Sequence, residues 1–286
     1  MQAMAEAVIP DTREFRFDDQ DFAFLRDMVR EQTGINLSEA KRELVYSRLS
    51  RRLRQLGLSG FSEYCALLQQ GDAEELVRMV NALTTNLTAF FREQHHFDYL
   101  RQHLLPELVR HDDGRRRLRV WSAGCSTGQE PYSIAMVLAE TLTDIENWDA
   151  RILATDLDTD VLEFGRLGIY AQDKVDKIER ARLQRWFLRG RDRNAGKVRV
   201  VSELRRLITF RQLNLIRKWP MRGPFDMIFC RNTLIYFDKE TQRDLVARFS
   251  ELLTPEGCLF LGHSESLHNV SEAFRLVGNT IYRRLS

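Results

Sequence analysis

Cysteine is scarce in this chain and shows no paired spacing. The 286 residues include four cysteines, Cys65, Cys125, Cys230 and Cys258, each far from the others in sequence. Cys230 and Cys258 stand in apolar runs, where a thiol packs as a small hydrophobic group. The sequence therefore indicates neither a disulfide framework nor a zinc site, and we expect no bound metal.

Long apolar runs and a strong net charge are also missing. No stretch approaches the roughly 18 apolar residues that cross a bilayer, and the N-terminus lacks the features of a signal peptide. The formal net charge of +2 argues against bulk binding of nucleic acid. We therefore expect a soluble, cytoplasmic protein that neither binds nucleic acid nor inserts into a membrane.

Helical patterns occupy the first hundred or so residues. Apolar side chains recur there at the spacing of one helix face, and glycines follow the periodic segments as terminators. A capping box at 72–75 marks a further helix start. The predicted helices begin near Phe22, after Ser38 and at the capping box, and they end at Gly34, Gly57 and about Leu83.

After Gly114 the pattern changes to strands that alternate with helices. Such alternation predicts an α/β fold with a mostly parallel sheet covered on both faces. We expect a helical domain over 1–90, a linker with a linking helix over 91–113, and a sheet domain over 114–286. The predicted strands are 118–122, 151–155, 225–230, 257–262 and 280–284.

An insertion at about 168–207 interrupts this alternation. It contains a basic helix over 178–188, and a glycine-flanked polar loop then precedes a β-branched run. This order predicts a small antiparallel hairpin. The insertion is either a solvated excursion without a role or a docking site, because a hairpin edge can accept a partner strand.

The segment 118–133 joins an apolar strand to a turn of small residues and a helix start. Gly124, Ser126 and Gly128 keep side chains out of the turn, so backbone N–H groups and the helix N-terminus can approach a polar cofactor. A second apolar strand ends in Asp156, whose carboxylate can hold two ribose hydroxyls. This layout predicts a nucleotide-type cofactor site.

The turn favours S-adenosylmethionine (AdoMet) over a dinucleotide. A pyrophosphate prefers the loop G-x-G-x-x-G, whereas this turn reads Gly124-x-Ser126-x-Gly128 with Glu130 two residues later. A carboxylate beside the loop repels a pyrophosphate but suits a cationic sulfonium or ammonium.

Two further segments are expected at the same pocket. Residues 86–92 lie between the helical part and the sheet domain, and residues 229–237 leave the carboxyl end of an apolar strand, where ligands bind in open α/β sheets. Arg231 and Asn232 therefore emerge beside the expected cofactor, and Tyr236 follows one turn later. Composition alone would favour a core aromatic at Tyr236 and a surface cation at Arg92; position favours a functional role for both.

These motifs together resemble the chemotaxis receptor methyltransferases of the CheR type. The resemblance runs from a basic helix at 46–53 through 86–92, 124–133 and 229–237 to the motif at 262–266. It implies a Rossmann-like AdoMet-dependent methyltransferase domain, a small all-helical N-terminal domain for receptor recognition and an inserted β-subdomain. It also implies methyl esterification of glutamate side chains on cytoplasmic helices of chemoreceptors during sensory adaptation, with S-adenosylhomocysteine as the second product.

The resemblance also assigns residues and partners. It implies recruitment to membrane receptor arrays and, as in some members, a receptor C-terminal tether peptide at the β-subdomain; we expect a monomer. To the family's cofactor contacts we add Gly124 from the loop argument. The cofactor-binding residues expected are Asn86, Thr88, Arg92, Gly124, Glu130, Asp156, Asn214, Leu215, Arg231 and Asn232.

A glutamate substrate requires little acid–base chemistry of the enzyme. Its carboxylate, with an ordinary pKa of about 4.3, is ionised at neutral pH and attacks a methyl group directly, so no general base is needed. The enzyme's task is then alignment and exclusion of water. Arg92 is the residue expected to steer a carboxylate, and Tyr236 the one expected to line the path of methyl transfer.

The predicted helix from Lys41 to Leu56 carries six basic residues against one acid. A solvated face is the ordinary interpretation of such a helix. Receptor methylation helices are acidic around their target glutamates, so the resemblance favours binding of substrate by electrostatic steering. The substrate-binding residues expected are Arg48, Arg51, Arg52 and Arg54.

Two other patterns are weaker indications of function. His95, His96 and His103 lack a suitably spaced partner for a metal site, and we expect solvated helix histidines. The motif at 262–266 lacks the last glycine of a hydrolase elbow and is expected to border the cofactor pocket. Two rival functions stay open, an AdoMet-sensing receptor adaptor without turnover and a methylase of RNA or a small molecule.

Overall fold

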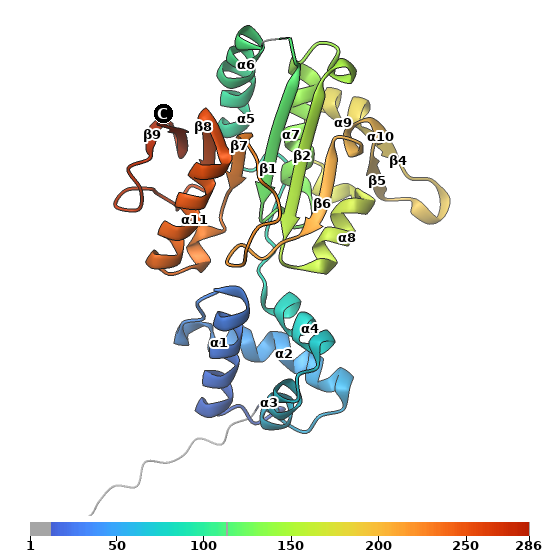
Figure 1. Cartoon of the computed structure of the whole chain (residues 1–286). Helices are drawn as coiled ribbons and strands as arrows, with labels where there is room; N and C mark the ends of the chain where they lie inside the picture. Colours follow the sequence, from blue (N-terminus) through green and yellow to red (C-terminus); the bar gives the residue numbers. More distant parts are fainter. Residues whose placement is uncertain (1–12, 113, 286) are drawn as a thin grey trace, which may run out of the picture. The chain divides into compact units, whose positions relative to one another are not determined.

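The computed structural model describes residues 13–112 and 114–285. The chain forms two compact units. The first contains the described residues up to 32 together with 36–83, and the second contains 33–35 together with the described residues from 84 onward. Figure 1 labels their helices and strands.

The first unit is built from helices around an aromatic core. Phe17 and Phe61 lie with their ring centroids 4.2 Å apart, and Leu49 and Leu53 are fully buried. The two helices predicted first are present, and Gly57 ends the second in the left-handed conformation. The helices are α1 (Asp19–Thr33), η1 (Glu39–Lys41), α2 (Arg42–Leu56), α3 (Phe61–Gln69) and α4 (Ala73–Leu83).

Only half of the predicted capping box forms at α4. The Asp72 carboxylate accepts hydrogen bonds from the backbone N–H groups of Glu74 and Glu75, at 2.9 and 3.1 Å. The Glu75 side chain does not return to the cap; it is buried and binds Arg52 and Tyr64 instead. The carboxylate therefore serves the core of the unit, and that part of the prediction is wrong.

The second unit contains a seven-stranded sheet in the order β6-β2-β1-β7-β8-β10-β9. Pairing is parallel from β6 to β8 and antiparallel at β10 and β9. β8 begins four residues earlier than predicted, because Leu253 already pairs with Phe225. β6 and β9 were not predicted. The strands are β1 (Arg117–Ala123), β2 (Asp149–Asp156), β6 (Ile208–Gln212), β7 (Phe225–Cys230), β8 (Leu253–Leu261), β9 (Phe274–Gly278) and β10 (Ile281–Arg284).

Helices cover both faces of this sheet, as the α/β pattern predicts (Figure 1). Leu118 and Val120 of β1 face one apolar cluster with α5, α6 and α7, and Trp121 and Ala123 face another with α11. Alternate residues of the strand thus enter opposite layers. The helices are α5 (His95–Tyr99), η2 (Leu100–Leu104), α6 (Leu105–His111), α7 (Gln129–Thr141), η3 (Ile145–Asn147), α8 (Thr159–Leu167) and α11 (Lys239–Leu252).

The predicted insertion forms a second, three-stranded antiparallel sheet in the order β3-β5-β4. Its basic helix is shorter than predicted, because Phe187 enters β4 and pairs with Val200. The predicted hairpin is therefore present, with β3 added at its other edge. The elements are β3 (Ile169–Ala171), η4 (Gln172–Lys174), α9 (Arg180–Trp186), β4 (Phe187–Arg189), η5 (Asp192–Asn194), β5 (Lys197–Val200) and α10 (Ser202–Arg205).

Two further observations concern the whole described chain. The four cysteines are buried free thiols. None of the helices formed by residues 13–112 and 114–285 has the length and apolar character of a membrane-spanning segment.

Candidate functional site

The turn between β1 and α7 is held open by backbone conformation. Gly124, Ser126 and Gly128 all have positive φ, at 85°, 49° and 93°. The N–H groups of Gly124 and Cys125 donate to the Thr155 carbonyl at 2.8 and 2.9 Å, which ties the turn to β2. The turn thus stands at the carboxyl end of β1, which lies between the parallel strands β2 and β7. The order of the strands reverses at this point, and open α/β sheets bind ligands at such a reversal.

Asp156, the last residue of β2, braces this turn. Its carboxylate accepts hydrogen bonds from the N–H groups of Ser126, at 2.8 Å, and Asp158, at 3.1 Å. Burial raises the pKa of Asp156, and these backbone hydrogen bonds oppose the rise. Each oxygen keeps a further lone pair, so the carboxylate can still accept from a ligand hydroxyl.

Hydrogen bonds hold the segment 84–88 beside the same turn. Asp158 accepts hydrogen bonds from Thr84 Oγ1 and Asn86 Nδ2, both at 2.8 Å. Ser126 Oγ in turn donates to the Asn86 carbonyl at 3.0 Å. Asn86 therefore lies beside the turn, and Thr88 follows it as a partly buried residue.

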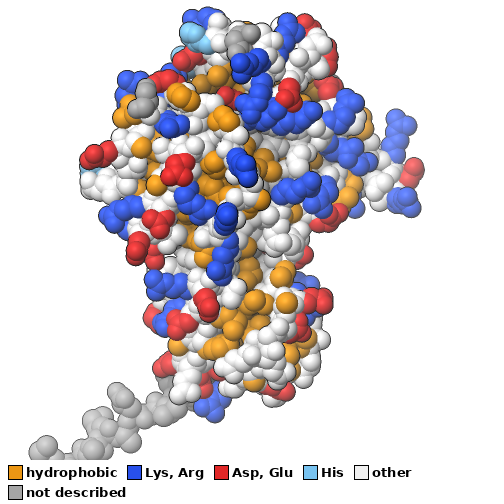
Figure 2. All heavy atoms as spheres, in the orientation of Figure 1, with side chains coloured by type: hydrophobic (Ala, Val, Ile, Leu, Met, Phe, Trp, Pro, Cys, Tyr) orange, Lys and Arg blue, Asp and Glu red, His pale blue; other side chains and the backbone are white. Residues whose placement is uncertain are grey.

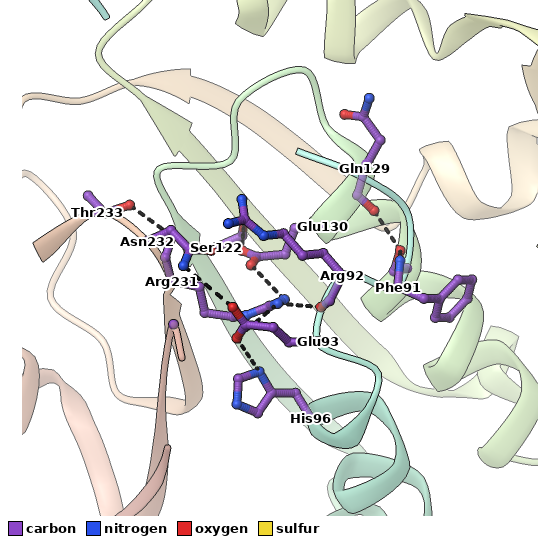
Figure 3. Close-up of polar contacts among 12 residues, drawn as sticks. Phe91, Arg92, Glu93, His96, Ser122, Gln129, Glu130, Arg231, Asn232 and Thr233 are labelled. Carbon is purple, nitrogen blue, oxygen red and sulfur yellow. Dashed lines mark hydrogen bonds and ion pairs between the residues drawn. The ribbon is translucent and has the colours of Figure 1, made fainter. Parts of the chain in front are cut away.

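Arg231 is the centre of a buried charge cluster at the end of β7 (Figure 3). Its guanidinium donates to Glu130 Oε2 at 3.2 Å and to the Arg92 carbonyl, and it lies 3.4 Å from Glu93 Oε2. Only 2% of the Arg231 side chain is exposed. Burial raises the pKa of Glu130, against the opposing charge of Arg231 and a hydrogen bond from Ser122.

Arg92 stands on a turn of unusual backbone. Phe91 and Glu93 on either side of it have φ of 53° and 59°, a conformation that few residues other than glycine adopt. The Phe91 N–H donates to Ser133 Oγ of α7 at 3.0 Å, and Arg92 Nη1 donates to the Leu87 carbonyl at 2.8 Å. The Arg92 side chain is partly buried near Glu130 and Arg231 (Figure 3).

The loop after β7 is held by a carboxylate that the sequence did not single out. Glu265, 6% exposed, accepts hydrogen bonds from the N–H groups of Gly262, Asn232 and Ile235. Burial raises its pKa, and these backbone donors oppose the rise. The motif at 262–266 thus supports the loop that carries Asn232. Tyr236 closes the following turn η6 (Leu234–Tyr236) and is partly buried.

The segment after β6 completes the surroundings of Asp156. The Leu213 N–H donates to the Asp156 carbonyl at 2.9 Å, and Asn214 Oδ1 accepts from the Ile216 N–H at 3.1 Å. Leu215 is buried, and its carbonyl accepts hydrogen bonds from the Trp219 and Arg248 side chains. The geometry therefore brings the predicted residues Asn214 and Leu215 to the end of β2.

The interpretation of His96 as a solvated histidine is wrong. Its side chain is fully buried, and Nε2 lies 3.2 Å from the Asn279 carbonyl, to which it donates. Burial, followed by the charge of Arg231, lowers its pKa to about 3, so the ring is neutral. Glu93, His95 and His96 are close enough to share a cation, but the guanidinium of Arg231 already faces the Glu93 carboxylate.

The basic residues of α2 are mostly engaged within their own unit. Arg52 binds the buried Glu75 through both Nε and Nη2, and Arg54 binds Glu14 in the same two-pronged way. Arg48 donates to the carbonyls of 82 and 83. Arg51 is exposed, and within residues 13–112 and 114–285 no hydrogen bond or ion pair engages its side chain.

This arrangement suits a cationic ligand that also carries hydroxyl groups. Two largely inaccessible carboxylates, Glu130 and Asp156, lie on either side of the turn, and a carboxylate removed from water gains most from a neighbouring cation. Arg231 Nε is buried without a hydrogen-bond partner in the described part of the chain. A Cβ at Gly124 would meet Thr233 Oγ1 at 2.4 Å, so the turn tolerates only glycine there.

Comparison with known proteins gives matches along nearly the whole chain. Residues 86–283 match the family model "CheR methyltransferase, SAM binding domain", and residues 20–84 match "CheR methyltransferase, all-alpha domain". Chemotaxis protein methyltransferase 2 of Pseudomonas aeruginosa is 49% identical over 94% of this chain and 95% of its own length. Chemotaxis protein methyltransferase of Escherichia coli is 45% identical over 95% of this chain and 93% of its own.

A probable chemotaxis protein methyltransferase of Rhizobium etli is 44% identical over 90% of this chain and 96% of its own length. Among solved structures, geranyl diphosphate methyltransferase in complex with SAM is 15% identical over 67% of this chain and 54% of that chain, with a TM-score of 0.33.

Proposed function

The chain belongs to the CheR methyltransferase family and is an AdoMet-dependent methyltransferase of chemotaxis, and on that premise we propose that it forms methyl esters on glutamate side chains of chemoreceptors. The observation that carries the proposal is the likeness to chemotaxis protein methyltransferases at 45–49% identity over more than nine tenths of both chains.

Glutamate esterification fits the polar groups of the site. When bound, AdoMet supplies a methyl group made electrophilic by the adjacent sulfonium. A substrate carboxylate is already ionised at neutral pH, so the protein need not remove a proton. Among the ionisable side chains nearest the turn, Glu130 pairs with Arg231 and Asp156 accepts backbone hydrogen bonds, and both are suited to holding ligands and excluding water.

Each predicted site residue keeps its role within this proposal. Arg92 steers a carboxylate, since a guanidinium has five N–H donors and only part of that capacity is used by the Leu87 carbonyl. Tyr236 lines the path of methyl transfer. The cofactor is held by Asn86, Thr88, Arg92, Gly124, Glu130, Asp156, Asn214, Leu215, Arg231 and Asn232.

Receptor recognition is proposed for the basic helix α2, through Arg48, Arg51, Arg52 and Arg54. Exposure supports the largest role for Arg51, because Arg52 is only 14% exposed and neutralises Glu75. Arg54 is exposed and shares its charge with Glu14. The helix would then act by steering an acidic receptor helix, and its contribution should weaken with salt.

The β4–β5 hairpin is the proposed site for a receptor's C-terminal tether peptide. Several Lys and Arg side chains project from this part of the surface (Figure 2), which suits a peptide ending in a carboxylate. Such binding would recruit the enzyme, as a cytoplasmic monomer, to receptor arrays; truncation of a cognate receptor's tail should then weaken binding. The exposed cations of the hairpin are Arg189, Arg191, Arg193, Lys197 and Arg199.

The experiment is transfer of a radiolabelled methyl group from AdoMet to receptor-containing membranes, followed by mild alkali. Label released as methanol identifies a carboxyl methyl ester and supports the proposal. Alkali-stable label identifies methylation of nitrogen and contradicts it. If AdoMet binds but no label is transferred to several receptors, the chain acts as an adaptor without turnover.

A further inference from the structure

The carboxylate of Glu93 gathers side chains from three other segments of the second unit. It receives His263 from the turn after β8, Arg231 and Asn232 from the loop after β7, and His96 from α5. Figure 3 shows it between Arg231, Asn232 and His96. No role for Glu93 follows from the loop, the strand ends or the motifs that define the cofactor site.

We propose that Glu93 is the positioning residue of the cofactor site, which fixes Arg231, Asn232 and the Arg92 turn in one arrangement. The inference rests on the proposed function, because those three residues are proposed cofactor contacts. Glu93 acts through them and does not itself touch the ligand.

The two Glu93 oxygens make different contacts: Oε1 accepts hydrogen bonds, and Oε2 makes an ion-pair contact. Oε1 accepts from His263 Nδ1 at 2.9 Å, from the His263 N–H at 3.2 Å and from Asn232 Nδ2 at 3.4 Å. Oε2 faces the Arg231 guanidinium at 3.4 Å. Only 9% of the Glu93 side chain is exposed, so water cannot replace these partners at low cost.

The backbone of Glu93 also contributes to this arrangement. With φ of 59° it stands in the left-handed region, which is unfavourable for a residue other than glycine. The side-chain contacts and the hydrogen bond from Arg231 to the Arg92 carbonyl hold the turn in place. Release of the Glu93 carboxylate would therefore free both the Arg92 turn and the Arg231 guanidinium.

Glu93 keeps its charge over the whole physiological range. Burial raises its pKa, but the hydrogen bond from His263 and the charge of Arg231 outweigh burial and hold the pKa at about 2. His96, which also faces this carboxylate, is neutral. The pairing of Glu93 with Arg231 is thus permanent, as a positioning contact requires.

The test is binding of AdoMet and of S-adenosylhomocysteine to the full chain, measured by calorimetry, for Glu93→Gln. The matched control is Glu107→Gln in α6, whose carboxylate pairs with Arg283 at 2.8 and 2.9 Å and has no proposed role at the site. We expect Glu93→Gln to raise both dissociation constants about tenfold or more, since a charge-assisted contact is lost. Glu107→Gln should lower the melting temperature and leave both constants within about twofold.

The two ligands separate positioning from simple electrostatics. AdoMet carries a sulfonium charge and S-adenosylhomocysteine does not, so loss of affinity for AdoMet alone would mean that Glu93 acts by its charge and would overturn the proposal. Unchanged affinity for both ligands with a lowered melting temperature would make Glu93 merely structural. These experiments measure ligand binding and not methyl transfer to receptors. If the proposed glutamate substrate is incorrect, the binding constants are therefore unaffected.

A second variant covers the case in which Glu93→Gln does not fold. His263 is 62% exposed, so His263→Ala removes a donor to Glu93 without opening the core. We expect a smaller rise of both dissociation constants, of about threefold. An unchanged dissociation constant in His263→Ala contradicts the proposal, as does a double variant whose loss of affinity equals the sum of the two single losses in free energy.

Discussion

Asp158 receives the side-chain amide of Asn86 at 2.8 Å, across 72 positions of sequence. The same carboxylate caps α8, where its other oxygen accepts from the N–H groups of Asp160 and Val161. One buried side chain therefore starts a helix and fixes the segment that carries proposed cofactor contacts.

Asp158→Asn should separate these two tasks. An asparagine still caps a helix, but its NH₂ group cannot accept from Thr84 and Asn86, and a buried unsatisfied donor costs about 1–3 kcal/mol. We expect that loss in urea unfolding, together with weaker AdoMet binding by calorimetry. Asp72→Asn, at the cap of α4, is the control and should change stability by a few tenths of a kcal/mol. Equal effects of the two variants would contradict this division.

Gly124→Ala should weaken cofactor binding beyond its cost in stability. At φ of 85° a Cβ is strained, by about 1–2 kcal/mol, and here it also meets Thr233 Oγ1 at 2.4 Å, next to Asn232. Gly71→Ala is the matched control, because its φ is 84° and nothing lies within 4 Å of the added Cβ. Both variants should lose stability, and only Gly124→Ala should lose affinity for AdoMet. Normal affinity in Gly124→Ala would remove Gly124 from the site.

The family resemblance, the fold class and the cofactor predicted from sequence are confirmed. They were predictable because their signals are local: a strand, a turn of small residues and an acid at the next strand end each lie within a few residues. The helix α3 was missed since it is short, and its burial comes from Phe61 packing on Phe17, which no local pattern encodes.

The supporting carboxylates were not predictable for a different reason. Glu93 follows Arg92 in a stretch that reads as an exposed charged turn, yet its partners Asn232 and His263 lie 139 and 170 positions away. Arg52 likewise resembles a free cation of a basic face until Glu75, 23 positions later, is placed beside it. Pairings of this kind depend on the folded chain.

Arg51 and Arg52 are adjacent in α2, and substitution should affect receptor methylation at Arg51 and stability at Arg52. Arg51→Glu should leave stability unchanged and lower kcat/KM for receptor methylation about fivefold at low salt, with the difference shrinking as salt rises. Arg101→Glu, an exposed arginine of the other unit, is the control for net charge. An equal loss in both variants would show that α2 has no special role in receptor binding.

Arg52→Ala should instead destabilise the first unit. It leaves Glu75, 3% exposed, with Tyr64 Oη as its remaining side-chain partner among the contacts described. Removal of one partner of a buried ion pair costs about 3–5 kcal/mol. Urea unfolding followed by circular dichroism measures this loss. A variant as stable as the wild type would mean that the Arg52–Glu75 pair contributes nothing net.

Acid should destabilise the second unit through His96 and Glu93. The pKa of His96 falls from its ordinary 6.5 to about 3 in the folded chain, so between these values the unfolded state alone binds the proton. Stability therefore falls as pH decreases below 6.5, by up to about 1.4 kcal/mol per pH unit. Glu93, with its pKa lowered from 4.5 to about 2, stabilises the fold above pH 4.5, and that contribution is lost between 4.5 and 2.

His96→Gln isolates the first of these two effects. Glutamine does not titrate, so the free energy of unfolding should vary less between pH 6.5 and 5 in the variant than in the wild type, by about 1–2 kcal/mol over that interval. The measurement is urea unfolding at several pH values, with His103→Gln as the control because His103 is exposed in the same helical stretch. A wild-type pH dependence in His96→Gln would mean that the buried ring is not the group responsible for the loss of stability in acid.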